Sequence, residues 1–206
     1  ADFSLKVLDH KKSESDFKFL QKSQVIILCV PISSMPDVLD EIRSHISLNS
    51  LVIDTCSVKE WPIKKMKEIL PAEVQILGTH PMFGPDSVKD TLFGTKIVVC
   101  PERIKQQKLD NIIYYLENHG IRVINTTARD HDKQMSSSLL LSHFIGKGLL
   151  EFGAKDQEID TKGYRRLLRI LETVQNDSDA LFKDMFKYNS YAKDTLTAFL
   201  SALKKN

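Results

Sequence analysis

The sequence has no excess of charge of either sign and no long apolar run. Its 206 residues include 29 Lys and Arg against 27 Asp and Glu, a formal net charge of +2. Nucleic-acid-binding proteins carry a concentrated basic surface, which these interspersed charges do not predict. The longest apolar run, Val25 to Ile32, contains Pro31 and is far shorter than the roughly 18 residues that cross a bilayer. We therefore expect neither nucleic acid nor a membrane as a partner.

Cysteine is scarce, and its spacing indicates neither disulfide bonds nor a metal site. The three cysteines, Cys29, Cys56 and Cys100, lie at or just past the ends of apolar runs, and no Cys-x-x-Cys or Cys/His metal spacing occurs. We expect buried, reduced thiols and no metal site. This pattern is typical of a protein of the cytoplasm or of an organelle matrix.

Apolar strand-like runs alternate with amphipathic segments over the first two thirds of the chain. The expected strands are 25–30, 51–54, 74–77, 96–100 and 121–124. The expected helices are 36–46, 58–70 and 102–119. This alternation predicts an α/β fold, a Rossmann-like doubly wound and largely parallel sheet with helices on both faces.

The strand pattern stops at Ala128. Three helical segments follow, near 128–152, 161–174 and 177–203. We expect an α/β domain over 1–127 and an all-helical domain over 128–206. The helical segments expose apolar faces, for example Leu139–Leu141 and Phe144, and a homodimer through these helices would cover them.

A Gly-x-Gly-x-x-Gly turn is absent from the sequence. In dinucleotide-binding sheets this turn follows the first strand and lets the backbone approach the pyrophosphate. Residues 1–8 are typical of the tail of a helix leading to a short strand, without an initiator Met. We expect that the natural protein carries the missing strand, turn and helix upstream; the alternative is a protein without a phosphate cradle.

Gly78–Pro85 is the most informative segment. It follows the apolar run Val74–Leu77, and we expect it to form a loop that holds His80 at the carboxyl end of a strand. Ligands of open α/β sheets bind at this edge. Histidine accepts protons near neutral pH, so His80 is a candidate general base. The alternative is a histidine that only fills the loop.

Four ordered motifs resemble the prephenate and arogenate dehydrogenases, most of all those of plant type. These motifs are Val52–Glu60, Gly78–Ser87, His131-Asp132 with His143, and Ile159–Tyr164. The resemblance implies an NAD(P)-dependent oxidative decarboxylation in tyrosine biosynthesis. Arogenate would give tyrosine, and prephenate would give 4-hydroxyphenylpyruvate. For a eukaryotic source it also implies a plastid or other organelle matrix.

The resemblance implies the catalytic roles. His80 would accept the proton of the ring hydroxyl as hydride leaves the adjacent carbon, and Ser57 would hydrogen-bond both His80 and that hydroxyl. The alternative for Ser57 is a helix N-cap, since Glu60 three residues later completes a capping box. His131 and Asp132 are interpreted as mainly structural residues at a helix start.

Substrate contacts are implied in the same way. His143 would face the ring carboxylate, the alternative being a core histidine. Thr79 and Lys162 are further candidates, although Lys162 also fits a surface position. Asp177 would favour the amino group of arogenate over prephenate, unless it only caps a helix.

The cofactor is expected at the carboxyl edge of the sheet. Cys29, Val30, Pro31, Ile32 and Thr55 follow two strands and would line its nicotinamide side. We expect NADP from the plant-type resemblance, with NAD as the alternative. Nearby, Asp9 would favour a ribose hydroxyl, as in NAD, whereas Lys11 and Lys12 would favour a phosphate, as in NADP. These residues therefore leave the choice of cofactor open.

Two other functions stay open at this point. A β-hydroxyacid-type dehydrogenase has a similar layout but needs a catalytic lysine in its helical half. A non-catalytic homologue would keep a substrate pocket and a dimer interface while lacking the phosphate-binding loop. Binding of NADP by the native protein would distinguish an enzyme from the second alternative.

Overall fold

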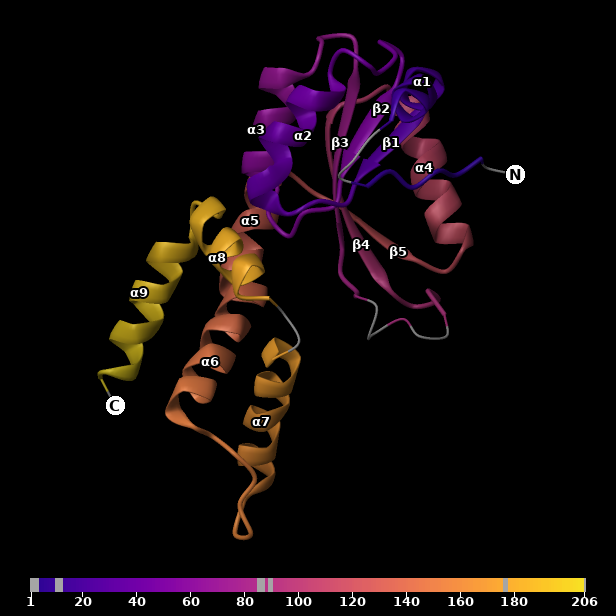
Figure 1. Cartoon of the computed structure of the whole chain (residues 1–206). Helices are drawn as coiled ribbons and strands as arrows, with labels where there is room; N and C mark the ends of the chain where they lie inside the picture. Colours follow the sequence, from indigo (N-terminus) through magenta and orange to yellow (C-terminus); the bar gives the residue numbers. More distant parts are fainter. Residues whose placement is uncertain (1–3, 10–12, 85–87, 89–90, 176–177, 206) are drawn as a thin grey trace.

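The computed structural model describes residues 4–9, 13–84, 88, 91–175 and 178–205 as a twisted sheet joined to a group of helices (Figure 1). The strands are β1 (Val25–Leu28), β2 (Leu51–Asp54), β3 (Gln75–Pro81), β4 (Lys96–Arg103) and β5 (Arg122–Asn125). The helices near the sheet are α1 (Glu14–Lys22), η1 (Ile32–Ser34), α2 (Met35–Ile42), α3 (Glu60–Ile69) and α4 (Gln106–Asn118). The remaining helices are α5 (Ala128–Ser137), α6 (Leu139–Phe152), α7 (Lys162–Gln175), α8 (Asp179–Tyr188) and α9 (Ala192–Leu203).

The sheet confirms the predicted Rossmann-like α/β fold. Its five strands lie in the order β1-β2-β3-β4-β5, and every neighbouring pair is parallel except β3 with β4. The expected loop at His80 was wrong, because β3 continues to Pro81 and His80 pairs with Val98 of β4. The antiparallel pairing with β4 extends β3 and fixes the direction of the histidine side chain.

Side chains alternate across the sheet and give it two apolar faces. One face carries Ile26, Val52, Ile76 and Val98, which pack against α2 and α3. The opposite face carries residues that pack against α4: Leu51, Leu77, Val99 and Val123. His80 and Asp54 have the same parity as the first set, so both project toward the side of α2 and α3.

The helical part shares its core with the sheet. Leu140 of α6, Met185 of α8 and Ala192 of α9 belong to the same buried cluster as the residues on the α2 and α3 face. Helix α5 contacts α3 and β4. The predicted boundary at 127/128 stays a prediction, since apolar packing continues across it.

Several predicted elements differ in extent. The expected helix over 128–152 is two helices that divide at Ser138, and the expected helix over 177–203 divides between α8 and α9. The expected helix at 102 starts later because β4 extends to Arg103. Helix α1 was missed, and residues 4–9 form neither helix nor strand.

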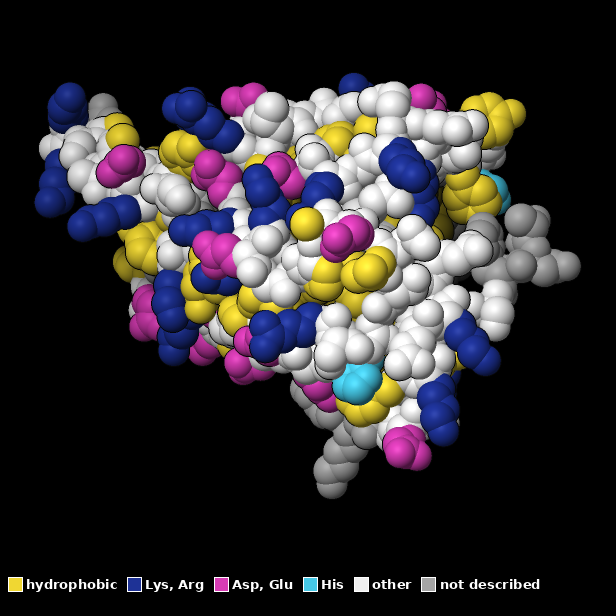
Figure 2. Space-filling model, turned by 90° about the horizontal axis from the view of Figure 1, so that it is seen from above, with side chains coloured by type: hydrophobic (Ala, Val, Ile, Leu, Met, Phe, Trp, Pro, Cys, Tyr) yellow, Lys and Arg dark blue, Asp and Glu magenta, His cyan; other side chains and the backbone are white. Residues whose placement is uncertain are grey.

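Charges are mixed on the face seen in Figure 2, where Lys and Arg side chains lie among Asp and Glu. Within the described part of the chain, no helix is both long enough and apolar enough to cross a membrane.

Helices α6 and α7 pack closely at Gly146. A Cβ atom built on Gly146 would lie 2.6 Å from Val174 Cγ2 and 3.2 Å from the backbone oxygen of Ile170. Gly146→Ala should therefore lower the free energy of unfolding by about 1–3 kcal/mol, since the backbone of α7 must move. Urea denaturation followed by circular dichroism measures this change.

Gly148 on the same helix is the matched control, because a Cβ there meets no atom within 4 Å. Gly148→Ala should leave stability unchanged or raise it by up to about 1 kcal/mol through helix propensity. Equal effects of the two substitutions would contradict the close packing of α6 on α7.

Candidate active site

A chain of three side chains links β3 to α5. His80 Nδ1 lies 2.9 Å from His131 Nε2, and His131 Nδ1 lies 2.7 Å from Asp132 Oδ1. All three residues are buried, with His80 7% exposed. His80, the predicted base, is thus bonded through Nδ1 to the imidazole of His131, which in turn is bonded to the carboxylate of Asp132.

Asp132 also caps the N-terminal end of helix α3. Its Oδ1 accepts the backbone N–H of Lys59 at 2.7 Å, and its Oδ2 accepts that of Glu60 at 2.9 Å. The first N–H groups of a helix have no partner within the helix, so a carboxylate from another element can cap them. The alternative role of Ser57 as the N-cap of this helix was therefore wrong. The N-cap residue of α3 is Lys59, and the carboxylate that accepts the first N–H groups belongs to Asp132.

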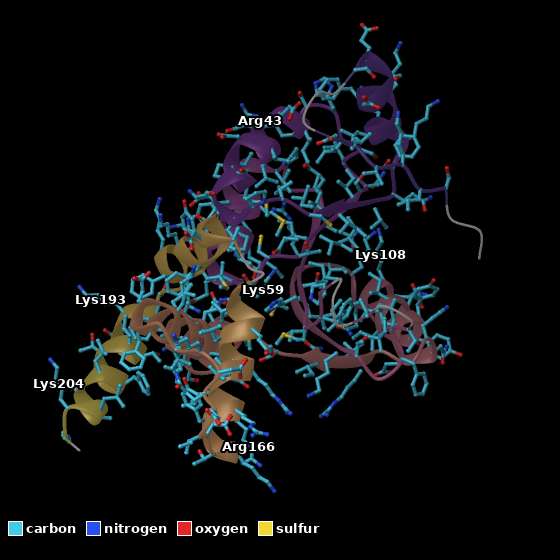
Figure 3. The ribbon with its side chains drawn as sticks, turned by 60° about the horizontal axis from the view of Figure 1, so that its bottom comes forward. Arg43, Lys59, Lys108, Arg166, Lys193 and Lys204 are labelled. Atoms are coloured by element: carbon cyan, nitrogen blue, oxygen red, sulfur yellow. The ribbon has the colours of Figure 1, made fainter. Side chains whose placement is uncertain are left out.

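A buried ion pair lies beside this chain. Lys59 is fully buried, and its Nζ contacts Asp54 Oδ1 and donates to the backbone oxygen of Thr79 at 2.5 Å. Figure 3 shows Lys59 at the junction of sheet and helices, whereas Arg43, Arg166 and Lys204 lie at the periphery. Burial raises the pKa of Asp54, and the neighbouring Lys59 opposes that rise.

The surroundings keep His80 neutral. Burial, together with the nearby His131 and Lys59, lowers the pKa of His80 to about 3. A neutral imidazole has one unprotonated ring nitrogen, which is the requirement for a proton acceptor. The carboxyl end of β3 therefore holds an available proton acceptor, and the cost of burying its cation makes it a weak base unless other groups stabilise the protonated form.

The side chains beside His80 differ from expectation. Ser57 Oγ is buried and has no hydrogen-bond partner among the described residues, so the expected bond to His80 is not formed. Thr79 Oγ1 donates to the backbone oxygen of Asp54 at 2.7 Å and joins β3 to β2. Contacts of Ser57 and Thr79 with a substrate stay predictions.

The predicted substrate residues are dispersed. His143 of α6 is buried, with its ring 6.4 Å from that of Phe182 of α8 and nearly parallel to it. Lys162 is exposed at the start of α7, next to the connection from α6 that lies far from the sheet in Figure 1. The structure does not bring Lys162 to His80. Asp177 lies outside the described residues.

The predicted cofactor residues follow β1 and β2. Thr55 Oγ1 donates to the backbone oxygen of Leu28 at 2.9 Å, which joins the ends of the two strands. Cys29 and Pro31 are exposed, Val30 is partly buried, and Ile32 is buried in the core. The side chain of Ile32 therefore packs inward, so only its backbone can face a ligand.

Helix α8 holds the segment after β1. Asp184 Oδ2 accepts the backbone N–H of Ser33 at 2.9 Å and the hydroxyl of Ser33 at 2.7 Å. This carboxylate caps η1, and it ties the predicted cofactor side of the site to the helical part. Sequence patterns gave no sign of this contact, because 151 residues separate the two partners.

The cysteines only partly match expectation. Cys56 and Cys100 are buried, and burial raises the pKa of each thiol to about 12. Cys29 is exposed, so its expected burial was wrong. Among the described residues, no three His, Cys, Asp or Glu side chains form a metal-binding group.

Lys59 and the linkage through His131 were missed by sequence reasoning. Lys59 stands in a motif that was noted only for resemblance, and the pair His131-Asp132 was interpreted as mainly structural at the start of its own helix. One signal was present: Asp54 ends the buried run 51–54, and a buried carboxylate requires a partner.

The pair of Asp54 and Lys59 gives a stability prediction. Lys59→Met should lower the free energy of unfolding by about 3–5 kcal/mol, because Asp54 stays buried without its counter-ion. Lys67→Met is the control, since the ion pair of Lys67 with Glu102 is partly exposed and should contribute less than about 1 kcal/mol. Urea denaturation of both variants compares them. A loss no larger for Lys59→Met than for the control would contradict the role of the buried pair.

Comparison with known proteins shows the family of this chain. The family model described as prephenate dehydrogenase, nucleotide-binding domain, matches residues 2–125, and one described as TYRAAT1-like, C-terminal domain, matches 148–205. Chloroplastic arogenate dehydrogenase 2 of Arabidopsis thaliana is 34% identical over 182 residues, covering 85% of this chain and 51% of that protein. Arogenate dehydrogenase 1 of the same plant is 32% identical over 193 residues, covering 91% and 30%. The chain thus spans about half or less of the length of these relatives.

Solved structures show the same fold. Synechocystis arogenate dehydrogenase has a TM-score of 0.71 at 22% identity, covering 92% of this chain and 72% of that one. Prephenate dehydrogenase from Aquifex aeolicus, in complex with hydroxyphenyl propionate and NAD+, has a TM-score of 0.74 at 18% identity, covering 95% and 71%. Because the nucleotide-binding family model covers more than half of the sequence, this chain belongs to the prephenate dehydrogenase family.

Proposed function

We propose that this chain catalyses the NAD(P)-dependent oxidative decarboxylation of arogenate to tyrosine, or of prephenate to 4-hydroxyphenylpyruvate. The observation that carries the proposal is His80, a neutral imidazole at the carboxyl end of β3, bonded through its Nδ1 to His131. Membership of the prephenate dehydrogenase family supports the reaction class.

The chain's own contribution is to take and hold one proton. As the ring carbon loses hydride, its hydroxyl gives its proton to the ring nitrogen of His80 that does not face His131, and the alcohol becomes a ketone. Loss of carbon dioxide then makes the ring aromatic and leaves a phenolate, which takes back the proton held by His80 and becomes the phenol of the product. The low pKa of His80 keeps it unprotonated before the substrate arrives.

A nicotinamide cofactor, when bound, supplies the hydride acceptor. We place its nicotinamide side at the joined ends of β1 and β2, where Cys29, Val30, Pro31 and Thr55 lie. The sequence holds no Gly-x-Gly-x-x-Gly turn, so no pyrophosphate contact is assigned. We propose NADP over NAD from the plant-type resemblance alone.

Arogenate is the proposed substrate over prephenate. Two Arabidopsis relatives above 30% identity are named arogenate dehydrogenases, which supports this choice. Asp177 would supply the anion that favours an amino group, and His143 would face the ring carboxylate. A place in the cytoplasm or an organelle matrix is proposed on the same basis, since these relatives are named chloroplastic.

No observation favours the other functions. A β-hydroxyacid-type enzyme needs a catalytic lysine in the helical half, and no lysine of the described helical residues is buried. The buried lysine of the site, Lys59, lies in the α/β half and is paired with Asp54.

His80→Asn should lower kcat by about 10²- to 10⁴-fold without changing the affinity for the cofactor. Absorbance at 340 nm reports the reduced nicotinamide, with arogenate and prephenate each tested with NADP and NAD. The matched control is His119→Asn, at the exposed C-cap of α4, where the ring bonds the backbone oxygen of Tyr115 in that helix. Near-normal turnover of the His80 variant would remove His80 as the base, and wild-type inactivity with both substrates would reject the proposed function.

We also propose a homodimer through the helical part. Large apolar side chains are exposed along these helices, among them Phe152 at 83% and Leu203 at 55%. A monomer rarely leaves such side chains together in water, and a second copy would cover them.

Phe152→Asp should weaken self-association at least about tenfold, because a charge would be buried in the interface. Tyr114→Asp on α4 is the control, an aromatic residue outside the helical part that is 69% exposed. Sedimentation equilibrium measures both. A wild-type protein that stays monomeric at every concentration would reject the dimer.

A further inference from the structure

The partners of His80 decide which of its two nitrogens can accept a proton. We propose that Asp132 and His131 are positioning residues that hold His80 with its proton on Nδ1 and its lone pair on Nε2. The proposal rests on the proposed function only for what Nε2 does. The positions of the protons are argued from the hydrogen bonds, with Asp132 ionised and His131 neutral.

The first step is the charge of Asp132. Both of its carboxylate oxygens accept a backbone N–H at the start of α3, Oδ1 from Lys59 and Oδ2 from Glu60. An aspartate is ordinarily ionised at neutral pH, and two N–H donors at the positive end of a helix suit that form, so Asp132 is taken as an acceptor.

The second step is the tautomer of His131. Its Nδ1 lies 2.7 Å from Asp132 Oδ1, and an ionised carboxylate only accepts. Nδ1 of His131 must therefore carry a hydrogen. With His131 neutral, its Nε2 is then an acceptor, because a neutral imidazole carries only one N–H. A doubly protonated His131 would instead donate from Nε2 and force the opposite tautomer on His80, so the test below decides between the two forms.

The third step is the tautomer of His80. Its Nδ1 lies 2.9 Å from this acceptor, so Nδ1 is the donor and carries the hydrogen. The lone pair of His80 is then on Nε2, on the opposite side of the ring from α5. Two imidazoles in series thus pass the orienting effect of one carboxylate to the base, which carboxylate–histidine pairs achieve directly in other sites.

The same bonds support the product of proton transfer. When Nε2 has taken the substrate's proton, His80 is a cation whose Nδ1–H still donates to His131. Asp132 polarises His131 and so stabilises that cation, against a desolvation cost that burial imposes on it. Asn189 keeps this pair in place, since its Nδ2 donates to the backbone oxygen of Asp132 at 2.9 Å.

The test is the imidazole nitrogen spectrum of the wild-type protein. With ¹⁵N-labelled histidine, two-bond correlation spectra show which nitrogen of each ring carries hydrogen, at slightly alkaline pH without substrate or cofactor. His80→Asn and His131→Gln assign the signals. We expect the Nδ1–H form for both rings. His80 with its hydrogen on Nε2 would overturn the proposal, whatever the enzyme's activity.

Variants of His131 add a kinetic readout. His131→Leu removes the acceptor, so His80 should shift toward the Nε2–H form and kcat should fall about 10- to 100-fold with little change in KM. His131→Gln can offer an amide oxygen to Nδ1 of His80, and it should keep the tautomer and recover most of the lost rate. Equal rates and equal tautomers in the two variants would overturn the role of His131.

A matched control separates position from general damage. His119→Leu makes the same substitution on an exposed surface of α4 and should change neither the spectrum of His80 nor kcat. If the His131→Leu variant does not fold, the wild-type spectrum still decides the proposal. Absence of turnover in the wild type would reject the proposed function, and the tautomer would remain a separate result.

Discussion

Asp132 is the residue on which the site depends, because one carboxylate serves two elements. It caps the start of α3 through two backbone N–H groups and orients His131 through a third hydrogen bond. Helix α3 packs on the sheet, and α5 carries the imidazole that reaches His80. The position of the base in β3 is therefore set from the helical half of the molecule.

Buried charge surrounds this carboxylate, and each charge has a partner. Lys59 contributes its backbone N–H to Asp132 and its side chain to Asp54 and to the backbone of Thr79. Removing ions from water costs several kcal/mol each, which such pairing must offset. The first turn of α3 therefore makes two connections. Its backbone N–H groups bond Asp132 of α5, and the side chain of Lys59 joins β2 to β3.

Two further contacts connect the sheet edge to the helices. Asp184 of α8 caps η1 after β1, and Asn189 beyond α8 bonds the backbone of Asp132. One apolar cluster continues beneath them from the sheet to α6, α8 and α9. The proposed cofactor side and the carboxylate behind the base are thus each bonded to the helical part.

Local pattern alone determined the strands, the two-part layout and His80 as the residue of interest. Runs such as Leu51–Asp54 are apolar on both sides of the chain, and a strand buried in a sheet between two helix layers requires that composition. Four ordered motifs determined the family. The extent of β3 was beyond local pattern, because the antiparallel partner that extends it through Pro81 comes from β4.

Only the tertiary structure decided what His80 touches. Its expected partner, Ser57, is near in sequence, whereas its actual partner, His131, is 51 residues away. Likewise the cap of α3 comes from Asp132 rather than from the capping box that the sequence predicts. Hydrogen bonds between distant residues depend on how helices pack on a sheet, and packing is a property of the whole chain that no short segment encodes.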